Sequence, residues 1–154
     1  MAMKPSDFLA REDIVLGLRA ANKSALMNAL AKLAAARLKL PAEAISAPLL
    51  AREALGSTGI GRGIAIPHAR IPTLQQFFGV LVRLEKPLDF AAIDEQPVDL
   101  VFLLLTPEKA KREHLAALAT ISRVLRDNDM VRDLRAARNP GELYQRLQKA
   151  ADQC

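Results

Sequence analysis

Residues 56–70 read Gly56-Ser57-Thr58-Gly59-Ile60-Gly61-Arg62-Gly63-Ile64-Ala65-Ile66-Pro67-His68-Ala69-Arg70. The four glycines within eight residues predict a loop, because glycine adopts positive φ without a steric penalty. The aliphatic residues that follow predict a short strand that ends at Pro67. Pro67 fixes its own φ and holds Ile66 extended, so His68 is expected at a stiff strand terminus.

The imidazole of His68 has two interpretations. At pH 7 an imidazole with an ordinary pKa of about 6.5 is mostly neutral and carries a lone pair that can attack phosphorus. The glycine segment before it can present backbone N–H groups to an anion. It is neither a P-loop nor a dinucleotide fingerprint, because no Gly-Lys-Ser/Thr follows and because it precedes a strand. The other interpretation is a turn residue that ends a strand, and the local pattern leaves both open.

Two helices are expected before this segment. Asn22 offers a capping side chain, and leucines recur at helical spacing to about Lys39. A second helix is expected over 41–55, although Pro48 removes a backbone donor and is expected to kink or divide it. Arg52 lies on the apolar face of this second helix, where an arginine requires an anion. Residues before Asn22 show no clear element.

Strands and helices are also expected after the segment. Residues 77–84 and 98–105 are rich in large apolar residues and predict strands buried on both faces. Thr106 offers a capping hydroxyl before Pro107, which predicts a helix start there. Two short helices are expected to open at 127–128 and at 139–140. Helices around a small sheet make an α/β layered domain.

His114 falls on the buried stripe of the helix expected after residue 105. Ligands gather outside the carboxyl ends of strands in α/β sheets, which favours a functional role. The alternative is a core histidine whose ring is satisfied by a carbonyl group. His68, His114 and Arg52 form one site only if the fold brings them together.

Length and composition limit the remaining possibilities. A chain of 154 residues predicts one domain, and the single Cys154 excludes an internal disulfide framework. The apolar runs are too short for a spanning helix and no secretory signal is visible, so we expect no membrane insertion and a cytoplasmic location. Two separated histidines do not predict a metal site, and no cofactor is expected.

The formal net charge of +5 is unevenly distributed. Residues 109–138 hold eight basic and four acidic residues, so a net +4 lies there and +1 in the rest of the chain. Arginines interleaved with aspartates are typical of a solvated helix face, which is the first interpretation. A docking surface for a protein is the second. Nucleic-acid binding is the least favoured, and no nucleic-acid partner is expected.

The segment 56–70 resembles the active-site motif of the fructose/mannitol-type enzyme IIA domains of the bacterial phosphoenolpyruvate-dependent phosphotransferase system, and it looks most similar to the nitrogen-regulatory branch. The resemblance extends over nearly the whole chain, including residues 93–100 and Glu113-His114-Leu115. It implies one domain over 1–154, with about ten N-terminal residues and the last few loose, and a mixed β-sheet flanked by helices.

The resemblance also implies roles for residues. His68 is the phosphoryl acceptor, Arg52 faces the phosphoryl group, and His114 is the second active-site histidine. The phosphate-binding loop that we predict comprises Gly56, Ser57, Thr58, Gly59, Gly61 and Gly63.

The implied function is that of a cytosolic phosphocarrier, a phosphotransferase with no small-molecule turnover of its own. The donor is a histidine-containing phosphocarrier protein of the HPr/NPr type, and the phosphorylation state reports to target proteins in nitrogen, carbon and potassium regulation. The alternative is a sugar-specific transport component that passes its phosphoryl group to a cysteine of an EIIB domain. A third possibility is a binding module that uses the basic region without phosphoryl chemistry.

Overall fold

The structure, a computed structural model, describes residues 4–151, and their central element is a six-stranded mixed sheet. The strands are β1 (Leu9–Leu18), β2 (Gly59–Gly61), β3 (Ile64–Ala65), β4 (His68–Ile71), β5 (Phe78–Leu88) and β6 (Val98–Pro107). The helices are α1 (Lys23–Leu38), α2 (Glu43–Ala54), α3 (Lys111–Leu125), α4 (Asn128–Ala136) and α5 (Pro140–Ala151), with a 3₁₀ turn at Pro5–Asp7. The predicted α/β domain with a mixed sheet flanked by helices is confirmed.

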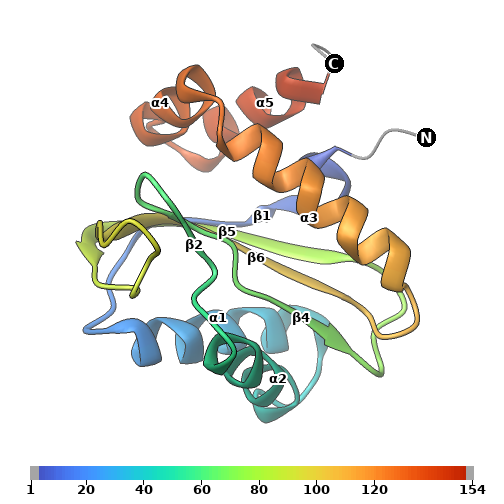
Figure 1. Cartoon of the computed structure of the whole chain (residues 1–154). Helices are drawn as coiled ribbons and strands as arrows, with labels where there is room; N and C mark the ends of the chain where they lie inside the picture. The colour runs from blue at the N-terminus through green and yellow to red at the C-terminus, as the bar shows by residue number, and fades with distance from the viewer. Residues whose placement is uncertain (1–3, 152–154) are drawn as a thin grey trace.

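Helices cover both faces of the sheet (Figure 1). α1 and α2 lie on one face, and α3, α4 and α5 lie on the other. Each face has its own buried apolar cluster, because side chains alternate between faces along a strand. Within residues 4–151, no helix combines the length and the apolar character needed to cross a bilayer.

β6 is the central strand, and it is buried on both faces as its sequence predicts. Leu103 and Leu105 face α1 and α2, whereas Phe102 and Leu104 face the other three helices. β5 pairs antiparallel with one edge of β6. β3 and β4 pair parallel with successive parts of the opposite edge.

The parallel pairing of β4 with β6 positions the segment around His68. His68 lies opposite Leu104, and Arg70 lies opposite Thr106. His68 is therefore the first residue of β4, at a strand terminus as expected, and it is not the strand-ending turn residue of the alternative interpretation. The break at 66–67 separates β3 from β4, since Pro67 has no N–H for a sheet hydrogen bond.

The N-terminal segment differs from the expectation. β1 begins at Leu9 and pairs parallel with β5, where we expected about ten loose residues and no element before Asn22. Charged residues at 11–13 conceal the alternation, and one of them, Asp13, is buried and accepts a hydrogen bond from Arg37 at 2.7 Å. The expectation for the last few residues lies mostly outside the described range.

The helix predictions hold in part. Asn22 caps α1, with its side chain accepting from the N–H of Ala25, as predicted. α2 continues through Pro48 as one helix, so the predicted division does not occur, and the helix simply forgoes one hydrogen bond. α3 begins at Lys111 and not at Thr106, because β6 extends through residue 107.

Because β6 lies in the core, truncating one of its buried side chains should lower the stability of the protein strongly. Leu103 is 0% exposed, and Leu103→Ala should lower the free energy of unfolding by about 3 kcal/mol through lost burial and a residual cavity. Leu50 on α2 is 42% exposed, so the same change there should alter stability by no more than about 0.5 kcal/mol. Urea unfolding of both variants measures this difference, and equal losses would contradict the assignment of β6 to the core.

Candidate functional site

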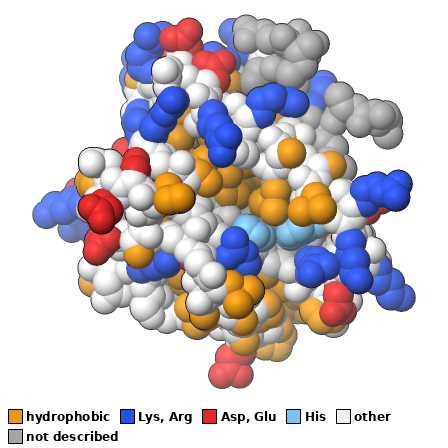
Figure 2. Space-filling view, in the orientation of Figure 1, with side chains coloured by type: hydrophobic (Ala, Val, Ile, Leu, Met, Phe, Trp, Pro, Cys, Tyr) orange, Lys and Arg blue, Asp and Glu red, His pale blue; other side chains and the backbone are white. Residues whose placement is uncertain are grey.

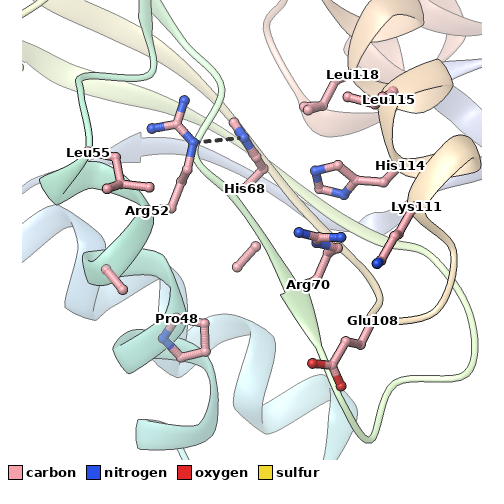
Figure 3. Close-up of a pocket in the computed structure, with 12 residues that line it drawn as sticks. Pro48, Arg52, Leu55, His68, Arg70, Glu108, Lys111, His114, Leu115 and Leu118 are labelled. Atoms are coloured by element: carbon pink, nitrogen blue, oxygen red, sulfur yellow. Dashed lines mark hydrogen bonds between the residues drawn. The ribbon is translucent and has the colours of Figure 1, made fainter.

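An open pocket of about 800 Å³ lies where α2, β4 and the start of α3 meet. Figure 2 shows both histidines at its surface, with basic and apolar side chains around them. Figure 3 shows how the functional groups converge from the three elements. The lining residues are Pro48, Ala51, Arg52, Leu55, His68, Ala69, Arg70, Glu108, Lys111, His114, Leu115 and Leu118.

The hydrogen bonds of His68 define the state of its ring. Nδ1 lies 2.8 Å from the carbonyl oxygen of Ile66. A carbonyl oxygen can only accept, so Nδ1 carries the proton and donates. Nε2 then holds the lone pair, and it accepts from Nε of Arg52 at 3.2 Å (Figure 3). The local chain thus leaves Nε2 as the nitrogen of this ring that carries the lone pair.

Arg52 reaches His68 from the last turn of α2. Its Nη1 also donates to the carbonyl oxygen of Gly56 at 2.8 Å, which holds the guanidinium over the end of the helix. The side chain of the next residue, Glu53, is 6% exposed; it forms an ion pair with Lys23 at 2.7 Å and accepts a hydrogen bond from the backbone N–H of Thr58. These contacts tie the end of α2 to the glycine segment, so the Pro48 position does not displace Arg52 from the site.

His114 lies in the first turns of α3, and its ring centroid is 5.5 Å from that of His68. It is 9% exposed. Its Nδ1 is 2.5 Å from the hydroxyl oxygen of Thr106, which is fully buried. The fold therefore brings His68, His114 and Arg52 together, which local sequence patterns could not establish.

Both imidazoles are neutral at pH 7. Burial lowers the pKa of His68 below its ordinary 6.5, against the opposing effect of the Ile66 carbonyl, and the positive charge of Arg52 lowers it further. Burial, followed by the proximity of His68 and of Arg70, lowers the pKa of His114 to about 4. Each ring thus carries a single N–H and a single lone pair at neutral pH.

The predicted phosphate-binding loop does not line the pocket. Its members are Gly56, Ser57, Thr58, Gly59, Gly61 and Gly63, and none of them is among the lining residues. Several of its backbone N–H groups already have partners: that of Thr58 donates to Glu53, and that of Gly59 donates to the Ser57 hydroxyl. An anion at His68 would have to compete for these donors.

The glycines are required by packing and turn geometry. A Cβ on Gly59 would stand 2.7 Å from that of Ala92. Gly63 has φ +80°, and a Cβ there would lie 2.7 Å from Nη2 of Arg135. Only residues without a side chain allow this close approach at 59 and 63. The close approach in turn places β3 and β4 along β6.

Arg70 and Lys111 line the pocket but were not predicted as site residues. Strand alternation is a signal that could have found Arg70, since it lies two residues after His68 on the same face of β4. Together with Arg52 they supply three basic side chains to the lining, against the single carboxylate of Glu108. The pocket is therefore suited to an anion.

Several arginines of the basic region at 109–138 are paired with carboxylates. Their ion pairs include Arg132–Asp129, Arg132–Asp133, Arg135–Asp99 and Arg138–Glu142. This arrangement favours the solvated helix face among the three interpretations. Within the residues described, no three His, Cys, Asp or Glu side chains gather as a metal site would require.

Fold and site together define an α/β domain that brings two neutral histidines and an arginine together in a pocket lined mainly by basic and apolar side chains. Residues 7–150 match the family "Phosphoenolpyruvate-dependent sugar phosphotransferase system, EIIA 2". The chain belongs to this family of phosphotransfer proteins, as the resemblance of residues 56–70 predicts.

Relatives within the family include several nitrogen regulatory proteins. The chain is 45% identical to a nitrogen regulatory protein of Bradyrhizobium diazoefficiens over 92% of this chain and 93% of that one. It is 43% identical to the nitrogen regulatory protein of Escherichia coli over 91% of this chain and 86% of that one. The crystal structure of nitrogen regulatory protein IIA-Ntr from Neisseria meningitidis superimposes with a TM-score of 0.88 at 33% identity, covering 92% of this chain and 97% of that one.

The charges around His114 predict how its pKa responds to substitution. Arg70→Gln removes a positive charge that disfavours the imidazolium, so the pKa of His114 should rise from about 4. An NMR titration of the ring resonances measures this change. Lys32→Gln removes the same charge at an exposed residue of α1 outside the pocket and should leave the pKa unchanged. An unaltered titration in the Arg70 variant would contradict the assigned electrostatics.

Proposed function

We propose that this protein is a phosphocarrier of the phosphoenolpyruvate-dependent phosphotransferase system that accepts a phosphoryl group on Nε2 of His68. The observation that carries this proposal is the contact between Nδ1 of His68 and the Ile66 carbonyl at 2.8 Å. This contact leaves Nε2 as the one basic nitrogen of the ring, directed at the pocket. The donor is the phosphohistidine of a histidine-containing carrier protein of the HPr/NPr type.

The transfer exchanges one P–N bond for another. The lone pair of Nε2 forms the new bond to phosphorus, and the electron pair of the broken P–N bond returns to the ring of the donor histidine. Nδ1 of His68 keeps its proton and its hydrogen bond to Ile66. Nε of Arg52, which donates to Nε2 before transfer, must turn to the phosphoryl oxygens, because Nε2 no longer has a lone pair.

The pocket supports this transfer through its charges and donors. A loose phosphoryl transition state carries charge on its equatorial oxygens, so positioning and neutralisation supply most of the rate. The guanidinium of Arg52 can make two parallel hydrogen bonds to these oxygens, and Arg70 and Lys111 add positive charge. His114 adds a neutral donor on the other side of His68.

We also propose that the phosphorylation state regulates target proteins in nitrogen, carbon and potassium metabolism. The relatives at 43–45% identity, which are nitrogen regulatory proteins, support this branch. Leu55 and Leu115 stand on the pocket rim, 85% and 67% exposed, where a protein partner can contact them. A phosphoryl group adds about −1.5 to −2 charges at the centre of this rim, so partners that bind the unmodified face lose complementarity.

A phosphorylation assay tests the acceptor. The protein is incubated with phosphoenolpyruvate, enzyme I and the histidine carrier, and its intact mass is followed over time. One acid-labile phosphoryl group should appear on the wild type and none on His68→Ala. Arg52→Lys keeps the charge but loses the planar fork, and we expect the transfer rate to fall by about 100-fold.

Controls separate the proposed acceptor from the helper groups. His114→Gln should still be labelled, more slowly, because it retains His68. Labelling of His68→Ala at the wild-type rate, or no labelling of the wild type by carriers that are active on another enzyme IIA, would overturn the acceptor assignment. Rapid transfer onward to the cysteine of an EIIB domain would instead favour the sugar-transport alternative over the regulatory role.

A further inference from the structure

Thr106 contacts the second active-site histidine from beneath the pocket. It lies near the end of β6, opposite Arg70 of β4, and it is 0% exposed. It follows Leu104 on the face of the sheet that packs against α3, so its side chain meets the first turns of that helix. Its hydroxyl oxygen is 2.5 Å from Nδ1 of His114.

The direction of this hydrogen bond follows from the partners present. Among residues 4–151, Nδ1 of His114 is the only hydrogen-bond partner of the Thr106 hydroxyl. A hydroxyl that accepted from Nδ1–H would leave its own proton buried with no acceptor, which costs about 1–3 kcal/mol. Donation from the hydroxyl to the lone pair of Nδ1 satisfies both groups.

The second nitrogen of the ring is available to the pocket. Nε2 of His114 has no hydrogen-bond partner within residues 4–151, and no buried polar side-chain atom among them lacks a partner, so Nε2 is in contact with solvent. His114 lines the pocket beside His68 (Figure 3). A neutral imidazole carries one N–H, so a proton that is excluded from Nδ1 must be on Nε2.

We propose that Thr106 is a positioning residue for phosphoryl transfer: its hydroxyl donates to Nδ1 of His114 and so holds the ring proton on Nε2, where it donates to the phosphoryl group on His68. This proposal rests on the proposed function of His68. The opposite tautomer would place a lone pair against the phosphoryl oxygens and repel them. Thr106 thus decides whether His114 assists the transfer or opposes it.

The helix-capping role predicted for this hydroxyl does not compete with the positioning role. α3 begins at Lys111, and its N-terminal cap at Ala110 makes no side-chain hydrogen bond. The hydroxyl of Thr106 is therefore engaged with the ring alone among the residues described. Thr106 is 0% exposed, so solvent does not reach its hydroxyl. Water is therefore not expected to replace the hydrogen bond to His114 when the hydroxyl is removed.

The tautomer of His114 in the unphosphorylated protein provides the first test. Long-range ¹H–¹⁵N NMR at pH 7 should show a protonated Nε2 and an Nδ1 that accepts a hydrogen bond. Thr106→Val keeps the shape and removes the donor, so the Nδ1 resonance should move to the position of a non-bonded nitrogen or split between tautomers. A wild-type ring with its proton on Nδ1 would overturn the proposal.

The rate of phosphorylation provides the second test. Groups that orient metal-bound histidines are typically worth about 10- to 100-fold, and by analogy Thr106→Val should slow labelling of His68 by about tenfold. Thr106→Ser keeps the hydroxyl and should restore both the tautomer and most of the rate. Thr120→Val removes another buried hydroxyl, on α3, and should change neither.

The outcomes distinguish this proposal from the proposed function. A Thr106→Val variant with wild-type tautomer and rate would overturn the positioning role while His68 remained the acceptor. A wild type that takes no phosphoryl group would overturn the proposed function and the use of Nε2–H in transfer. In that case the NMR measurement would still decide the direction of the Thr106 hydrogen bond.

Discussion

The pairing of β4 with β6 is the contact on which the site depends. This short parallel ladder sets His68 opposite Leu104 and Arg70 opposite Thr106. It also brings His68 close to the start of α3, because only residues 108–110 separate β6 from that helix. Since side chains alternate along a strand, a slip by one residue would turn His68 away from His114 and toward the α1–α2 layer. The buried β6 strand, paired on both edges, makes such a slip costly.

Neutrality of the two imidazoles is the second constraint, and it follows from their surroundings. Burial and the nearby guanidinium groups disfavour the charged forms, so the pKa values of both rings are lowered. A protonated His68 would have no lone pair with which to accept a phosphoryl group. The same arginines that keep the rings neutral are suited to bind the phosphoryl oxygens, so one set of charges prepares the nucleophile and receives the anion.

The glycine segment shows that its glycines are needed for the structure itself. Its glycines mark a turn and close backbone approaches, as the sequence indicates, but the N–H groups of Thr58 and Gly59 are satisfied within the segment and by Glu53. The pocket beside His68 is lined by side chains from three separate elements, and none of the six predicted loop residues is among them. Thr106 is a similar case, because a hydroxyl before a proline suggests a helix cap whereas β6 continues past it and buries it under His114.

The sequence by itself determined the α/β class, the capped start of α1, the buried strands β5 and β6, and the three residues Arg52, His68 and His114 as candidates. Each of these follows from local periodicity, capping chemistry or the motif at 56–70. Only the tertiary structure decided that the three side chains meet, that β1 pairs with β5, and which nitrogen each imidazole presents. These features depend on contacts between residues far apart in the chain, or on a single carbonyl or hydroxyl beside a ring, and local patterns carry no information about either.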